Sequence, residues 1–307
     1  MSLQVRHYKD FRDFIVMTSI LAVGRKTSRR PYYVHTGDLS WWMFYDDRHD
    51  SHWGDQVHLW NLNGHPCGWS LIDPDWKSFD VYLLPELRGS REEAAILDWT
   101  IQKVTEIVRQ QGDQKIRTMW VSENDEDRRR QLAQRGFVQE QTFMWYLEHP
   151  LNAQIPELVV PADFVIRSLR GEDDLRQRAA ASYDAFGSSK QFEEYWLRYQ
   201  RFMRSPVYNP NYDLVAEAPD GQFASFCVIW PDPINRIGLF EPVGTHSSYQ
   251  HQGLGRAVVT EGLRQLKTFG MKSAMVCTEN NNPAALRLYQ AVGFKIKQKL
   301  LTYTKTI

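Results

Sequence analysis

The feature that most constrains the fold is an internal duplication, because the two halves of the 307-residue chain carry the same patterns in the same order. Each half opens with a short alternating run that predicts a strand, starting at Leu3 and at Phe164. Each half ends with a helical segment, a Gly-Phe pair that begins at Gly136 or Gly293, and another alternating run. Ordered matches of this kind are typical of repeated structural units. The sequence therefore predicts two copies of one fold.

A proline-rich stretch separates the two copies. Three prolines, the first of them Pro150, follow one another closely in the middle of the chain. Proline lacks a backbone donor and disfavours helix in the residue before it, so the stretch predicts an extended connector. We therefore expect a first domain over residues 1–147, a linker over residues 148–162 and a second domain over residues 163–307.

The composition argues against several classes of protein. Lys+Arg and Asp+Glu both number 37, whereas nucleic-acid binders usually carry a basic excess. The three cysteines are too scattered for a disulfide framework or a zinc site. No apolar run approaches the roughly 18 residues of a membrane span, and the first residues lack the apolar stretch of a signal peptide. We expect a cytoplasmic protein, monomeric or homodimeric, that binds neither nucleic acid nor a membrane.

The second half predicts an α+β unit with a mixed sheet, because strand-like and helix-like patterns follow one another between glycine and proline breaks. We expect strands over residues 164–169, 212–218, 223–230, 237–245, 272–278 and 294–304, and helices over residues 172–186, 191–203, 254–269 and 283–291.

The run from Gln250 to Ala257, QHQGLGRA, carries the clearest chemical signal. It follows a predicted strand and opens a predicted helix. A glycine-rich turn in this place lets backbone N–H groups approach a phosphate, and the helix N-terminus adds the positive end of its dipole. Gly253 and Gly255 remove the side chains that would block that approach. The segment therefore predicts a phosphate-binding turn.

A second motif follows this turn along the chain. It consists of Asn282, Tyr289 and the Gly293-Phe294 pair. In order and spacing, the glycine turn and this motif together resemble the signature of the GCN5-related N-acetyltransferases. The resemblance implies two tandem acetyltransferase-fold domains, each a mixed central β-sheet flanked by helices. It also implies acetyl-CoA as co-substrate and no metal.

The resemblance also assigns roles to individual residues. In such proteins the strand before the turn pairs with the pantetheine arm, the backbone amides of the turn hold the pyrophosphate, and the later asparagine contacts the cofactor. The corresponding cofactor-binding positions here are Val243, Gly244, Thr245, Gln250, His251, Gln252, Gly253, Leu254, Gly255, Arg256, Ala257 and Asn282. The tyrosine, Tyr289, can protonate the departing thiolate; an ordinary core aromatic is the alternative.

The transfer reaction also benefits from a general base, because the attacking amine must lose a proton. Glu241, on the predicted strand before the glycine turn, is the first candidate, and an ion pair or strand cap is the alternative for this residue. His246 is the second candidate. Glu193 or Glu194 could attract a cationic acceptor, although a solvated edge of an amphipathic helix explains both equally well.

The matching turn in the first half has a different chemistry. Aligning Arg88 with Gln250 places Glu93 where Gly255 stands, so a carboxylate would face a pyrophosphate. The position of the general acid is taken by Leu132. We expect this half to keep the fold but to lack the standard cofactor site, and the run Arg128–Arg130 to lie on a solvated helix face.

The first half is also rich in tryptophan. Six of the 11 tryptophans lie close together, and they either fill the core or form an aromatic wall of the acceptor pocket: Trp41, Trp42, Trp53, Trp60, Trp69 and Trp76. The nearby histidines are spaced irregularly, and we expect no metal site from them or from the aspartates between them: His49, His52, His58, His65, Asp46, Asp47 and Asp50.

The sequence therefore favours an acetyl-CoA-dependent N-acetyltransferase that acts on a primary amine of a small molecule. Three alternatives remain open. The tandem arrangement with one intact copy also resembles mycothiol synthase, and a C-terminal half without turnover would be an acyl-CoA sensor. Acylation of a protein or peptide in a groove between the halves is a third possibility.

Overall fold

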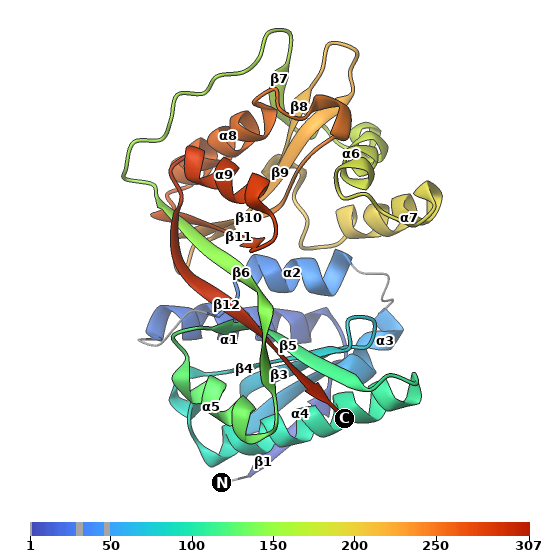
Figure 1. Cartoon of the computed structure of the whole chain (residues 1–307), viewed down its shortest axis with the longest axis vertical. Helices are drawn as coiled ribbons and strands as arrows, with labels where there is room; N and C mark the ends of the chain where they lie inside the picture. Colours follow the sequence, from blue (N-terminus) through green and yellow to red (C-terminus); the bar gives the residue numbers. More distant parts are fainter. Residues whose placement is uncertain (1, 29–32, 46–49) are drawn as a thin grey trace.

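The computed structural model describes residues 2–28, 33–45 and 50–307. Within these residues the strands form one 12-stranded mixed sheet, in the order β1-β2-β3-β4-β5-β12-β6-β11-β10-β9-β8-β7. Helices flank both ends of it, and both termini lie at the end built from the first half (Figure 1). The expected α+β fold class is confirmed.

The elements of the second half follow the predicted order, and the first half repeats that order with one additional helix, Asp50–Gln56. The first half contains β1 (Leu3–His7), α1 (Phe11–Thr27), α2 (Thr36–Tyr45), α3 (Asp50–Gln56), β2 (Val57–Leu62), β3 (His65–Asp73), β4 (Ser78–Leu83), α4 (Arg91–Gln110), β5 (Lys115–Ser122), α5 (Glu126–Gln134) and β6 (Val138–Pro150). The second half contains β7 (Val165–Ser168), α6 (Glu172–Ala185), α7 (Phe192–Met203), β8 (Asp213–Glu217), β9 (Phe223–Asp232), β10 (Ile237–Thr245), α8 (Leu254–Thr268), β11 (Ser273–Glu279), α9 (Pro283–Ala291) and β12 (Lys295–Thr306).

The two copies exchange their last strands. β6 ends the first half but pairs with β11 of the second, and β12 ends the second half but pairs with β5 of the first. β6 and β12 also pair with each other, and they run side by side through the middle of the molecule (Figure 1). The sheet is therefore continuous across the predicted boundary. β6 continues to Pro150, so the irregular connector begins at Leu151 rather than at Glu148.

Each copy contains one pair of parallel strands that pair only briefly. β4 and β5 share a single register pair, Ser78 with Arg117. β10 and β11 pair from Ile237 to Leu239 and no further. Because a short helical turn and a long helix follow β4 and β10, each copy places a helix N-terminus near the point where its parallel strands separate.

Helix α8 shows how the sequence pattern builds the core. Its expected apolar positions, Leu254, Val258, Leu263 and Leu266, are all buried, at most 1% exposed. They pack against the second-half sheet together with Ile229 and Phe240. Burial of this kind supplies roughly 1.5–3 kcal/mol for each large aliphatic side chain. This packing fixes the start of α8 against the end of β10.

Candidate functional site

The turn that precedes α8 leaves the helix N-terminus without a side-chain cap. Gly253 is the N-cap residue, with a left-handed φ of 83°, and its side chain offers no acceptor. His251 also has a positive φ, of 63°, and residues 251–253 are exposed. The first N–H groups of a helix have no intrahelical partner, so they favour an external anion here. This is the geometry of a phosphate-binding turn.

Gly255 allows close packing at the start of α8. A Cβ at this position would lie 3.2 Å from Oγ1 of Thr245 and 3.4 Å from Cδ2 of Leu288. The glycine therefore lets the first turn of α8 lie close to both β10 and α9. The turn is tied back to the strand by Gln250, whose Nε2 donates to the carbonyl oxygen of Thr245 at 3.4 Å.

The end of β10 has one free edge. Val243–Thr245 pair with β9 on one side, after a bulge that follows Phe240. On the other side, the ladder with β11 has already ended at Leu239. The backbone groups of Val243–Thr245 that point toward β11 are therefore open to an extended ligand, which could add to the sheet as a strand does.

Glu241 lies in the bulge of β10. The Nε1–H of Trp230 donates to its backbone oxygen at 2.6 Å, which fixes the bulged segment. Its side chain faces a cavity. Burial, followed by the charge and hydrogen bond of Asp38, raises the pKa of Glu241 well above its usual value. A carboxyl group with this raised pKa binds a proton more strongly than an ordinary glutamate does.

Tyr289 is buried at 5% exposure and packs against Phe294 in the core of the second half. Burial raises the pKa of Tyr289, and Cys227, Cys277 and Glu241 raise it further, so the hydroxyl group keeps its proton at neutral pH. The structure thus brings Tyr289 close enough to Glu241 for their charges to interact. The tyrosine is therefore a core aromatic whose hydroxyl group stays protonated.

The other sequence candidates have local partners. Asn282 caps α9, since its Oδ1 accepts from the N–H of Ala285 at 3.1 Å. Nδ1 of His246 accepts from the N–H of Ser248 at 3.2 Å, which ties up that ring nitrogen. Glu193 and Glu194 form ion pairs on an exposed helix edge, with Arg176 and Lys190 respectively.

A cavity of about 490 Å³ lies between the two halves and opens onto Glu241. Its aromatic lining comes from the first half: Trp41, Trp42, Tyr45, Trp76, Phe79, Trp120 and Phe143. Its charged lining is mostly acidic: Asp73, Asp80, Glu140, Glu241, Glu279 and, as the only cation among these, Arg117. The residues suit a ligand that carries positive charge and apolar surface.

The tryptophans of the first half divide between the two expected roles. Trp53, Trp60 and Trp69 are buried, at most 4% exposed, and fill the core. Trp41, Trp42 and Trp76 line the cavity instead.

Asp46, Asp47 and His49 lie outside the described residues. Across 2–28, 33–45 and 50–307, no three His, Cys, Asp or Glu side chains gather as metal ligands would. No helix in the described part of the chain has the length and apolar character to cross a bilayer.

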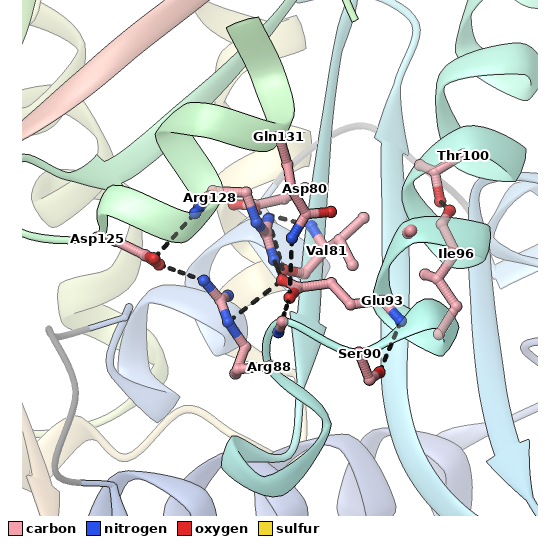
Figure 2. Close-up of polar contacts among 12 residues, drawn as sticks. Asp80, Val81, Arg88, Ser90, Glu93, Ile96, Thr100, Asp125, Arg128 and Gln131 are labelled. Atoms are coloured by element: carbon pink, nitrogen blue, oxygen red, sulfur yellow. Dashed lines mark hydrogen bonds and ion pairs between the residues drawn. The ribbon is translucent and has the colours of Figure 1, made fainter. Parts of the chain in front are cut away.

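The corresponding turn of the first half is closed by its own side chains (Figure 2). Oγ of Ser90 accepts from the N–H of Glu93 at 3.2 Å, and the Glu93 carboxylate accepts from the N–H of Gly89 at 2.5 Å. Arg128 and Arg88 lie 3.0 Å and 3.2 Å from the same carboxylate. Glu93 therefore occupies this helix N-terminus as an internal anion, rather than facing an incoming phosphate.

This network corrects one expectation. Arg128 is buried at 5% exposure, so the prediction of a solvated face for the whole run Arg128–Arg130 is wrong. Burial alone would raise the pKa of Glu93, but Arg128, Arg88 and the N–H of Gly89 outweigh it, so the pKa lies below its usual value. The run of three arginines in α5 hid this role, because the sequence alone does not show which of them faces inward.

Sequence reasoning also missed Asp38, which lies beside Glu241 at the start of α2. The available signal was the spacing of His35 and Asp38. A capping residue followed three positions later by an acidic residue is typical of a helix start.

Comparisons with known proteins agree with this geometry. The model of the "Acetyltransferase (GNAT) family" matches residues 174–294. The tandem GNAT protein from the clavulanic acid biosynthesis pathway has the same fold, with a TM-score of 0.71 at 12% identity, over 99% of this chain and 98% of that one. A GCN5-related N-acetyltransferase from Sphaerobacter thermophilus gives a TM-score of 0.66 at 16% identity, over 99% and 95% of the two chains.

Curated relatives match mainly one half of the chain. A mycothiol acetyltransferase of Thermomonospora curvata is 30% identical over 152 residues, or 48% of this chain and 50% of the relative. One of Sanguibacter keddieii is 26% identical over 252 residues, or 74% and 75% of the two. The first of these matches spans only about half the length of the relative.

These findings show a GNAT acetyltransferase family match over residues 174–294 and a tandem GNAT fold over the whole chain. The family match lies in the second half.

Proposed function

We propose that the protein is an acetyl-CoA-dependent N-acetyltransferase that transfers the acetyl group directly to a primary amine of a small molecule. The observation that carries this proposal is the uncapped N-terminus of α8, which lies beside the free edge of β10. Glu241 is on the same strand, and its charge acts on Tyr289. Acetyl-CoA supplies the thioester that the amine attacks. No step of the proposed reaction uses a metal.

Acetyl-CoA would lie along the end of β10 and the start of α8. The backbone groups of Val243–Thr245 would pair with its pantetheine arm. The N–H groups of residues 252–257 would hold its pyrophosphate, and Asn282 would contact it from α9. The close contact of Gly255 with Thr245 supports this placement, because a Cβ at this position would lie 3.2 Å from Oγ1 of Thr245 and crowd the turn against the strand.

Glu241 and Tyr289 have complementary tasks in this reaction. Glu241 accepts the proton that the amine loses as it attacks the thioester carbonyl. A tetrahedral oxyanion forms, and the C–S bond then breaks. Tyr289 gives its proton to the departing thiolate, for which its retained proton suits it. Holding the amine and the thioester together supplies a large part of the acceleration.

The acceptor would bind in the cavity between the halves. Burial raises the pKa of two of its carboxyl groups, those of Glu241 and Asp80. The carboxylates of Asp73, Glu140 and Glu279 also line it, against one arginine, so it attracts an ammonium group. Its aromatic lining adds cation–π attraction, of roughly 0.5–2 kcal/mol per well-placed ring. The Trp-rich half thus has a task in acceptor recognition although its own turn is closed.

The test is CoA release from acetyl-CoA with a panel of primary amines. We expect Tyr289→Phe to lower kcat by roughly 100-fold while acetyl-CoA binding by calorimetry stays intact. Tyr303→Phe is the matched control, because its hydroxyl lies on β12 and contacts Arg129 at 3.2 Å. Binding of acetyl-CoA without release of CoA for any amine would favour the acyl-CoA sensor instead.

An acceptor of the mycothiol type is a second, narrower candidate, favoured by the relatives that are mycothiol acetyltransferases. Desacetyl-mycothiol, which acetylation would convert to mycothiol, belongs in the amine panel beside glucosamine. A kcat/KM for desacetyl-mycothiol no higher than that for glucosamine would reject this acceptor.

A further inference from the structure

The start of α2, from the first half, is docked on the strand of the second half that carries Glu241. Nε2 of His35 lies 3.3 Å from the carbonyl oxygen of Ile237, at the beginning of β10. At Gly37, a Cβ would lie 2.6 Å from Cβ of Trp230, so only glycine allows this approach. The indole of Trp230 in turn holds the backbone of Glu241. The two halves therefore meet with little room for displacement at this point.

Asp38 is fixed within this contact by a reciprocal cap. Nδ1 of His35 accepts from the N–H of Gly37 at 2.9 Å, and Oδ2 of Asp38 accepts from the N–H of His35 at 2.5 Å. Asp38 is only 1% exposed. Trp41, one helical turn after Asp38, lines the same cavity as Glu241. Burial raises the pKa of Glu241, and the charge and hydrogen bonding of Asp38 raise it further. A capping residue of the first half thus acts on the candidate base of the second.

Two carboxyl groups this close cannot both ionise without strong repulsion, and they hold one proton between them. We propose that Asp38 is a positioning residue that forms a shared-proton carboxyl pair with Glu241, so that the first half completes the proton-accepting unit of the second. This inference rests on the proposed function. The first half, whose own turn before α4 is closed, would then act directly on proton transfer in the second half.

The other titratable groups around the pair come from three elements. Cys277 on β11 has its pKa raised by burial and then by Asp38 and Glu241, while Arg25 on α1 opposes this. Tyr289 on α9 feels the charge of Glu241. Tyr33, just before α2, feels the charge of Asp38. Arg25 is the one cation among these named groups, and it leaves the repulsion between the two carboxyl groups in place.

The pair sets the pH above which Glu241 can accept a proton from the acceptor. As the pH rises through the raised pKa of Glu241, the shared proton leaves and both carboxyl groups are ionised. An ammonium acceptor then gives one proton to the pair, which returns to its shared-proton form, and the free amine attacks. Replacing Asp38 by the neutral, similarly shaped asparagine removes the repulsion. Glu241 then ionises at lower pH but is a weaker base.

The experiment is a titration of the full chain by NMR, with glutamate labelled with ¹³C at its side-chain carboxyl. The Glu241 resonance is assigned by its loss in Glu241→Gln. We expect its midpoint to fall by about one pH unit or more in Asp38→Asn, a tenfold change in the acid constant. Glu279→Gln, which removes another carboxyl of the cavity, is the control and should leave the midpoint in place. An unchanged midpoint in Asp38→Asn would overturn the carboxyl pair.

The reciprocal measurement covers the case in which Asp38→Asn does not fold. With aspartate labelled instead, the Asp38 resonance in wild type should shift at the Glu241 midpoint, because ionisation of Glu241 places a charge beside it. This step should be missing in Glu241→Gln. A wild-type Asp38 resonance without a step at the Glu241 midpoint would equally reject the pair.

Kinetics separate this inference from the proposed function. With an amine that is turned over, the acidic limb of kcat/KM should move to lower pH in Asp38→Asn, by the same shift as the NMR midpoint. Absence of turnover with every amine would overturn the proposed function, and the NMR titration would still decide whether the pair exists.

Discussion

The helix N-termini of α8 and α4 are the same feature of the two copies, and they satisfy the same need in opposite ways. Both expose N–H groups that require an acceptor. At α8 no side chain caps Gly253, and the turn is open. At α4 Ser90 caps the helix, and the Glu93 carboxylate takes the N–H of Gly89 (Figure 2). The difference shows how an anion site can be replaced by an anion of the protein itself.

The replacement requires supporting residues. A buried carboxylate is unstable without partners, and Glu93 has Arg88, Arg128 and Gln131 around it. These side chains come from the loop before α4 and from α5, so two segments are held together through one charge. At α8 the corresponding contact is that of Gly255 with Thr245, which allows the turn to lie close to the strand.

The strongest test of the comparison makes the open turn resemble the closed one. Gly255→Glu introduces a Cβ beside Thr245 and a carboxylate that repels the phosphates. We expect acetyl-CoA binding to weaken roughly 1,000-fold, about 4 kcal/mol, measured by calorimetry. Thr268→Glu adds the same charge at the exposed far end of α8 and should leave the affinity unchanged. Equal affinities for wild type and Gly255→Glu would show that acetyl-CoA binds elsewhere.

The next test removes the internal anion. Glu93→Gln leaves Arg88 and Arg128 with less opposing charge in a buried place, and we expect a loss of about 3 kcal/mol in the free energy of unfolding by urea at pH 7. Glu106→Gln, at a solvated position of the same helix, should have no measurable effect. Because the pKa of Glu93 is lowered, its contribution is present above the unfolded-state pKa and disappears as the pH falls through the folded-state value. A difference between wild type and Glu93→Gln that is constant down to pH 3 would contradict this account.

The two helices that follow these turns show which features of the fold can be predicted from the sequence. Gly253 and the left-handed Gly270, φ 78°, mark the ends of α8, and both were predicted because glycine punctuation is local. The predicted elements of the second half agree with the structure to within two or three residues for the same reason. The pairing of β12 with β5 was not predicted, since an alternating pattern specifies a strand but not its neighbour.

The same limit applies to the candidate site. The motif located Glu241 and Tyr289 because both lie near it along the chain. Asp38 was missed because its role depends on where α2 docks, which no local pattern shows. Arg128 was misplaced because three consecutive arginines have the same character in sequence, and only the position of Glu93 distinguishes the first of them.

A smaller effect is expected at Asp80, which interacts with Arg128 behind the closed turn. Burial raises the pKa of Asp80 to about 7, although Tyr33 and Arg128 oppose the shift. A raised carboxyl pKa favours folding below the unfolded-state value, and this contribution is lost as the pH rises through the folded-state pKa. Wild-type stability should therefore fall relative to Asp80→Asn by about 2 kcal/mol between pH 5 and pH 8, measured by urea unfolding. Parallel pH profiles for the two proteins would show that Asp80 titrates normally.

The smallest and most direct test asks whether the closed turn can be opened. Glu93→Gly removes the internal anion and leaves the N–H of Gly89 beside Arg88 and Arg128, which also border a cavity of about 450 Å³. Phosphate should then bind where the carboxylate was and raise the free energy of unfolding by about 1.4 kcal/mol at ten times its Kd. Sodium chloride of equal ionic strength should not do so, and Glu106→Gly should show no phosphate effect. Equal stabilisation by chloride and phosphate would mean that the α4 turn no longer has the geometry of an anion site. Removal of the Glu93 carboxylate would then not be enough to make it resemble the α8 turn.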